Sequence, residues 1–185
     1  QSVLRCVMFK GQPGSELLLE GASVSAHGRV TFYERGGTTD FMVDLAVPQG
    51  MGELSLEFER LKLRLDQEGL FDESRKRPLP VFPVVVGVVT SPAGSVFHDI
   101  QNVIRRRFPV VELILVPTTV QGETAANGIV TGIEAINREK NIDIIILARG
   151  GGSFEELGPF NDETVARTIY ASRIPVVSGV GHETD

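Results

Sequence analysis

The chain has 185 residues, a hydrophobic fraction of 42% and a formal net charge of −6, which gives room for one large or two small domains and excludes a wholly disordered chain. The single cysteine, Cys6, excludes an intramolecular disulfide framework, and no apolar run reaches the length of a membrane span or resembles a signal peptide. These features predict a cytoplasmic protein without a membrane segment, and the acidic charge argues against general nucleic-acid binding.

Residues 1–52 have the pattern of β-structure. Residues 3–9 alternate loosely, and the apolar surroundings of Cys6 predict a buried, unreactive thiol. Residues 22–32 and 40–47 predict two strands, which a glycine-containing hairpin joins. The region therefore predicts part of a small antiparallel barrel, with fewer strands than a complete five-stranded barrel.

An amphipathic helix and a linker are expected next, over residues 53–82. The helix should cover residues 53–67 and end at Gly69, because apolar side chains recur at helical spacing between charges, at Leu54, Phe58, Leu61 and Leu65. Residues 72–80 are charged and rich in proline, which predicts a stiffened linker. The basic clusters at 75–77 and 105–107 can contact phosphates or simply form solvated surfaces.

From residue 83 onward, strand and helix patterns alternate. Strands are predicted at 84–90, 110–116, 143–148 and 174–178, and helices at 95–107, 122–139 and 161–171. Short apolar, β-branched runs are typical of buried parallel strands, and their alternation with helices predicts right-handed βαβ units. We therefore expect an α/β fold, a doubly wound parallel sheet with helices on both faces.

Two turns of this sheet carry most of the chemistry. One is Arg-Gly-Gly-Gly-Ser at 149–153, and the other is Gly-Val-Gly-His-Glu-Thr-Asp at 179–185. Because ligands bind beyond the carboxyl ends of parallel strands, we expect both turns to open onto one crevice, together with Ser91 and Asp99 after the first strand. This pairing predicts a phosphate-handling site with titratable groups.

The turn at 149–153 suits a phosphate for physical reasons. Without Cβ atoms, the N–H groups of Gly150, Gly151 and Gly152 can turn toward an anion, and a helix starting near Ser153 would add its positive end. The guanidinium of Arg149 can hold a phosphate through two hydrogen bonds. Two alternatives remain open, namely a tight structural turn and an Arg149 side chain that pairs with a carboxylate.

His182 and Asp185 share a face if their segment is helical. A histidine can act as general acid or base, and an aspartate can orient it or help to activate water. The alternative is that His182 caps an element or lies satisfied in the core. Together with Asp99 these residues could supply one imidazole and two carboxylates to a metal, but no metal-ligand spacing implies one.

Short motifs along the chain resemble the large subunit of exonuclease VII. They are RCVMF (5–9), GLFD (69–72), KRPLP (76–80), GVVTSPAG (87–94), PT and VQGE (117–123), RGGGS (149–153), PFND (159–162) and GHETD (181–185). The resemblance covers essentially the whole chain. It implies hydrolysis of single-stranded DNA from both ends into short oligonucleotides.

The resemblance also implies the domain organisation and the partners. Residues 1–52 would be part of an OB-fold that binds single-stranded DNA, residues 53–82 the helix and linker, and residues 83–185 the catalytic α/β domain. A sequence that starts at Gln1 and stops directly after a motif is expected to be part of a longer protein. A further C-terminal region would bind several copies of a small subunit.

The catalytic pattern implied by the resemblance is G-H-x-x-D-x-x-x-D. Gly181, His182 and Asp185 match it, and the second aspartate would fall beyond the end of the sequence, while Asp99 and Arg149 match other catalytic positions. No metal is required in this scheme. The substrate would contact Ser91, Gly150, Gly151, Gly152, Ser153 and Gly181. The family often carries tryptophan where this sequence has Gly158 and alanine where it has Gly179.

In residues 1–52, the side chains expected to contact bases or the DNA backbone are Phe9, Lys10, Phe32 and Tyr33, with ordinary barrel core as the alternative for the aromatics. Two other classes of function stay open. One is a non-catalytic module that binds single-stranded DNA, and the other is an α/β enzyme that acts on a small nucleotide or sugar phosphate.

Overall fold

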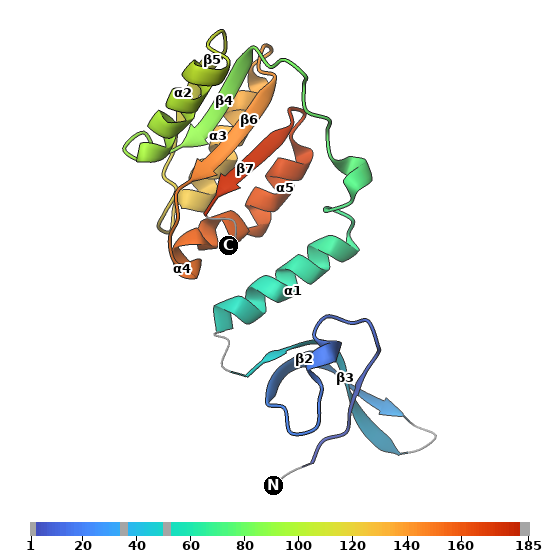
Figure 1. The fold of residues 1–185 in the computed structure, drawn as a ribbon. Helices are drawn as coiled ribbons and strands as arrows, with labels where there is room; N and C mark the ends of the chain where they lie inside the picture. Colours follow the sequence, from blue (N-terminus) through green and yellow to red (C-terminus); the bar gives the residue numbers. More distant parts are fainter. Residues whose placement is uncertain (1–2, 34–36, 50–52, 182–185) are drawn as a thin grey trace. The chain divides into compact units, whose positions relative to one another are not determined.

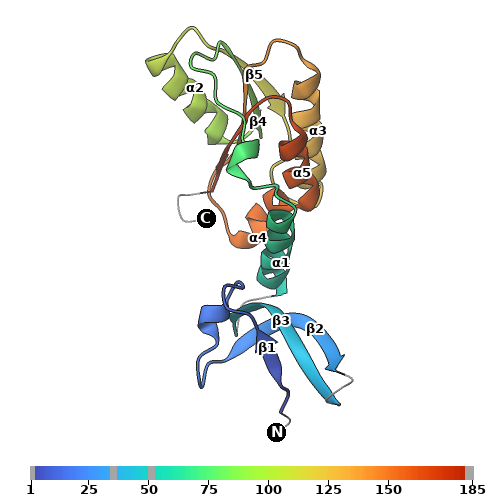
Figure 2. The same cartoon turned by 90° about the vertical axis from the view of Figure 1, so that its right-hand side faces the viewer.

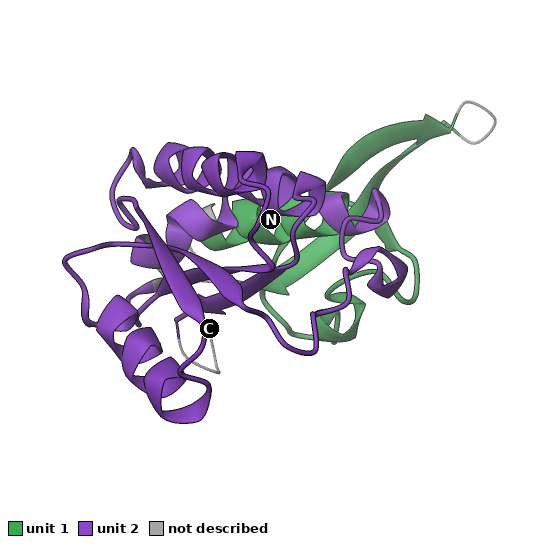
Figure 3. Cartoon of the chain, turned by 90° about the horizontal axis from the view of Figure 1, so that it is seen from above, with its two compact units in different colours: residues 1–64 green, residues 65–185 purple. Residues whose placement is uncertain are grey.

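The computed structural model describes residues 3–33, 37–49 and 53–181. The chain divides into two compact units, residues 1–64 and 65–185, which Figure 3 colours separately. The boundary falls within helix α1 (Glu53–Gln67), whose bounds are those predicted from its periodicity. In the described ranges, no helix is long and apolar enough to cross a membrane.

The first unit contains a three-stranded sheet in the order β1-β3-β2 (Figures 1 and 2). Its strands are β1 (Cys6–Met8), β2 (Val24–Tyr33) and β3 (Thr38–Pro48), and a 3-10 turn lies at Ser15–Leu17. The hairpin of β2 and β3 is antiparallel, as predicted, but β1 pairs in parallel with β3, so the sheet is mixed. This small mixed sheet is consistent with part of an OB-like barrel.

The position of each strand in this sheet determines its burial. The central strand β3 contributes Val43, Leu45, Ala46 and Val47, all of which are buried. Cys6 lies on the edge strand β1 and is exposed, so the prediction of a buried thiol is wrong. An edge strand has a neighbour on one side only, and the apolar residues around Cys6 in the sequence could not reveal that position.

Helix α1 ends as predicted at a glycine. Gly69 has a φ of +76°, and the N–H of Leu70 donates to the carbonyl of Leu65 at 3.0 Å. Such a left-handed residue closes a helix without the penalty that a Cβ would bring. The predicted linker follows, with a 3-10 turn at Glu73–Arg75.

The second unit contains the predicted parallel sheet, with strand order β5-β4-β6-β7. Its strands are β4 (Val85–Thr90), β5 (Glu112–Pro117), β6 (Ile144–Arg149) and β7 (Val176–Val180). The helices are α2 (Ser95–Arg107), α3 (Ala125–Arg138), α4 (Phe154–Leu157) and α5 (Glu163–Ala171), with a 3-10 turn at Gly158–Asn161. The expected α/β class is confirmed.

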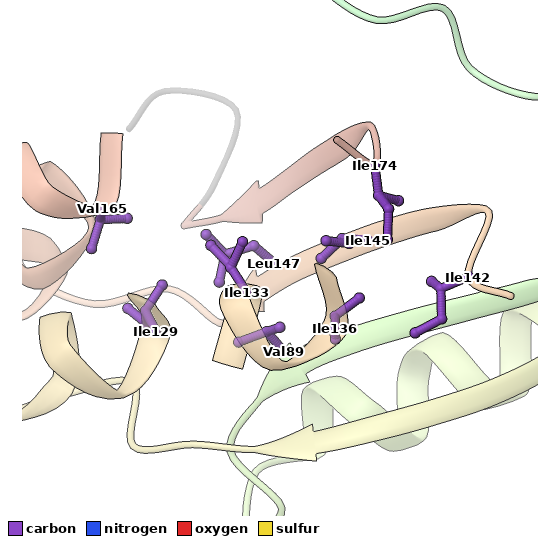
Figure 4. Close-up of a cluster of buried hydrophobic side chains, with 9 residues drawn as sticks. All are labelled: Val89, Ile129, Ile133, Ile136, Ile142, Ile145, Leu147, Val165 and Ile174. Atoms are coloured by element: carbon purple, nitrogen blue, oxygen red, sulfur yellow. The ribbon is translucent and has the colours of Figure 1, made fainter. Parts of the chain in front are cut away.

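Helices cover both faces of this sheet, α2 on one and α3 with α5 on the other (Figure 2). The larger core lies under α3 and α5 and is drawn in Figure 4, with Val89, Ile129, Ile133, Ile136, Ile142, Ile145, Leu147, Val165 and Ile174. The smaller core contains Val86, Val88 and Ile144, against which Phe97 and Ile100 of α2 pack. Burial of one such aliphatic side chain contributes about 1.5–3 kcal/mol, so the two cores fix the strands that carry the turns at the carboxyl edge.

Candidate active site

The two informative turns leave the sheet side by side. Strands β6 and β7 pair in parallel up to Arg149 and Val180, and the N–H of Gly181 donates to the carbonyl of Arg149 at 3.2 Å. Gly181 is therefore fixed next to Arg149 by the backbone alone. His182 and Asp185 follow directly in the sequence, and both lie outside the described residues.

Arg149 is buried and has one ionic partner among the residues that the structure describes. Its side chain is 7% exposed, and Nη2 lies 3.0 Å from Oε2 of Glu156. Nη1 is buried and has no hydrogen-bond partner in the described part of the chain. Arg149 thus does pair with a carboxylate, the alternative that the sequence left open, and its Nη1 takes no part in that pair. A buried donor without a partner is rare in folded proteins.

Glu156 was not predicted as a site residue, although the sequence carries a signal for it. Its N–H donates to Oγ of Ser153 and its Oε2 accepts from the N–H of Ser153, both at 3.3 Å. These reciprocal bonds form a capping box, for which Ser-x-x-Glu at 153–156 is the sequence pattern. The helix expected near Ser153 does begin there, but α4 is a single turn and adds little dipole.

The absence of a side chain at Gly152 leaves room for two charged neighbours. A Cβ built on Gly152 would lie 2.1 Å from Nη1 of Arg149 and 2.5 Å from Oε2 of Glu156. Gly150, Gly151 and Gly152 all have negative φ angles, so backbone conformation alone does not require glycine here. Their N–H groups donate no hydrogen bond to any described residue.

The start of α2 lies beside this turn. A Cβ on Gly150 would come within 3.6 Å of Cγ2 of Val96, and Asp99 is one helical turn beyond Val96 on the same side of α2. Asp99 is exposed and makes no hydrogen bond to a described residue. Ser91 closes its own turn, because its Oγ accepts from the N–H of Ala93 at 3.3 Å. The structure therefore brings α2 next to the glycine turn without joining Asp99 to Arg149.

Within residues 3–33, 37–49 and 53–181, no three histidine, cysteine, aspartate or glutamate side chains gather closely enough to hold a metal ion. Two of the three candidate ligands, His182 and Asp185, are not among these residues. The metal-free scheme therefore stays a prediction.

The chain is similar to known proteins over its whole length. Residues 70–185 match the family described as Exonuclease VII, large subunit. The chain is 50% identical to the exodeoxyribonuclease 7 large subunits of Caldanaerobacter subterraneus subsp. tengcongensis and Halothermothrix orenii and 48% identical to that of Clostridioides difficile. Each match covers 100% of this chain and 46% of the relative, so the chain spans a little under half the length of these relatives. The chain belongs to the exonuclease VII large subunit family.

Proposed function

We propose that the protein containing this chain hydrolyses phosphodiester bonds in single-stranded DNA, exonucleolytically from both ends to short oligonucleotides. Family membership supports the exodeoxyribonuclease class. The assignment of the site rests on Arg149. This residue lies at the carboxyl end of β6, and its buried Nη1 has no hydrogen-bond partner among the described residues. A phosphate oxygen that accepted from Nη1 would relieve the cost of an unpaired buried donor.

The chemistry of hydrolysis assigns a role to each predicted residue. Water attacks phosphorus while a base takes its proton, the bond to the leaving oxygen breaks, and that oxygen gains a proton. Arg149 and the amides of residues 150–152 would stabilise the charge that builds on the non-bridging oxygens. His182 would carry out one of the proton transfers, and Asp185 would orient it or the water. Asp99 would join this network from α2, and no metal is required.

The first unit offers side chains for the DNA strand itself. Phe9, Phe32 and Tyr33 are 63%, 65% and 60% exposed on this three-stranded sheet. Exposed aromatic rings can stack on bases of any sequence, and the exposed Lys10 can contact the backbone. We propose that residues 1–52 bind single-stranded DNA in this way.

We also propose an assembly with the small subunit, and one alternative function remains open. The large subunit would act in the cytoplasm with several copies of the small subunit, bound through a C-terminal region outside this sequence. The alternative is a non-catalytic module that binds single-stranded DNA. An enzyme of small nucleotides or sugar phosphates is disfavoured, because the named relatives are exodeoxyribonucleases.

A histidine variant separates the proposal from this alternative. His182→Ala in the full-length large subunit, assembled with its small subunit, should abolish cleavage of single-stranded DNA while binding is retained. Binding is measured by fluorescence anisotropy at fixed salt, because affinity for DNA depends strongly on salt. Cleavage by His182→Ala at the wild-type rate would contradict the proposed chemistry.

A further inference from the structure

One oxygen atom joins the buried arginine to the end of the glycine turn. Oε2 of Glu156 accepts from Nη2 of Arg149 at 3.0 Å and from the N–H of Ser153 at 3.3 Å. The two donors come from opposite ends of the segment 149–153. Glu156 thereby links the two ends of this segment through hydrogen bonds to one oxygen.

The guanidinium is held both by burial of the Arg149 side chain, which is 7% exposed, and by its bond to this oxygen. Among the described residues, Glu156 alone hydrogen-bonds to the side chain of Arg149, and Gly152 packs against the same guanidinium. The side chain of Glu156 is itself 57% exposed, so it is not held by burial. Instead, the carboxylate is held because Oε2 accepts from the N–H of Ser153, while the backbone N–H of Glu156 donates to Oγ of Ser153.

We propose that Glu156 is a positioning residue for Arg149. It would not touch the substrate. It would fix the guanidinium relative to the turn, so that Nη1 and the amides of residues 150–152 bind the same phosphate. This inference rests on the proposed function of Arg149. Since rates respond steeply to displacements of about 1 Å, loss of the shared oxygen should affect the chemical step more than DNA binding.

The test uses the full-length large subunit with its small subunit and compares Glu156→Ala with Glu156→Gln. Glu156→Ala removes the acceptor and should lower kcat for single-stranded DNA by about tenfold or more, with KM changed much less. Glu156→Gln keeps an oxygen in the same place and should recover most of that loss. Glu134→Ala is the matched control, because Glu134 is 53% exposed and pairs with Arg138 on α3, and it should cleave like wild type.

A double-mutant cycle excludes a merely structural role. In an Arg149→Lys background, Glu156→Ala should cause little further loss, because the two side chains act as a unit. Hydrogen exchange of the peptide 149–157 should be faster in Glu156→Ala, because the amide of Ser153 loses its acceptor.

The outcomes separate this inference from the proposed function. A wild-type kcat for Glu156→Ala, or a loss of the same size in both backgrounds, would overturn the positioning role alone. Wild-type cleavage by Arg149→Ala would overturn the proposed function, and the positioning role with it.

Discussion

The Cα of Gly152 lies so close to the guanidinium of Arg149 that a Cβ there would come within 2.1 Å of Nη1. The clash involves the ends of two flexible side chains, those of Arg149 and Glu156, and no backbone atom. Added bulk at residue 152 would therefore displace the guanidinium before it disturbed the fold.

Gly152→Ala should fold and yet lose activity. We expect cleavage of single-stranded DNA to fall by about tenfold or more, because the arginine is moved, while the Tm changes by a few degrees at most. Single-turnover cleavage and thermal unfolding of the full-length protein measure the two effects. A variant that cleaves like wild type would contradict the placement of Arg149 at the reacting phosphate.

Gly179→Ala, in strand β7, should stabilise the protein. A Cβ at Gly179 meets nothing within 4 Å, and its φ is not positive. Alanine restricts the unfolded chain, so we expect a gain of about 0.4–1 kcal/mol in the free energy of unfolding. Denaturant unfolding checks this, and a destabilised variant would contradict the open space seen beside β7.

Gly87→Ala should destabilise the α/β unit. A Cβ at Gly87 would lie 2.8 Å from Cδ1 of Ile136, which is 1% exposed in the core under α3. Overpacking of this kind costs about 1–3 kcal/mol. Gly158→Ala, where a Cβ meets nothing within 4 Å, is the control for denaturant unfolding. Equal stability of the two variants would contradict the packing of α3 on β4.

The carboxylate of Asp143 should make the free energy of unfolding depend on pH in the acid range. Its Oδ2 accepts from the N–H groups of Val84 and Val85 at 2.7 and 2.9 Å, and these bonds, that of Val85 foremost, lower the pKa of Asp143. The stabilisation is therefore present above the unfolded pKa of about 3.9 and is lost as the pH falls through the lower folded pKa.

Thermal unfolding of Asp143→Asn tests that dependence. The variant should be less stable than wild type at pH 7, and the difference should shrink as the pH falls below about 4. Asp66→Asn is the control, because the Asp66 side chain makes no hydrogen bond to a described residue. A difference between Asp143→Asn and wild type that is independent of pH would show that the carboxylate charge contributes nothing.

Local patterns predicted much of this fold. The bounds of α1 and α2 agree with prediction, because apolar periodicity and helix-terminal residues are read from neighbours in the sequence. The parallel pairing of β1 with β3 was not predicted, because strand direction depends on a partner distant in the sequence. Cys6 is exposed because β1 lies at the edge of the sheet, and that position also depends on distant strand pairing.

Part of the candidate site could also be predicted from the sequence, and part of it could not. Parallel strand order places Arg149 beside Gly181, as the sequence suggested. The capping pattern of Ser153 and Glu156 is visible in the sequence, but nothing local indicates that Glu156 also holds Arg149. The roles of Asp99, His182 and Asp185 stay predictions.

The most direct test of the central claim is end-labelled DNA cleavage by the full-length large subunit co-expressed with its small subunit. Single- and double-stranded DNA are compared, with and without a chelator, for wild type and Arg149→Ala. We predict cleavage of single strands that survives the chelator and disappears in Arg149→Ala. Binding without cleavage under every condition would contradict it and assign the protein to the non-catalytic DNA-binding class.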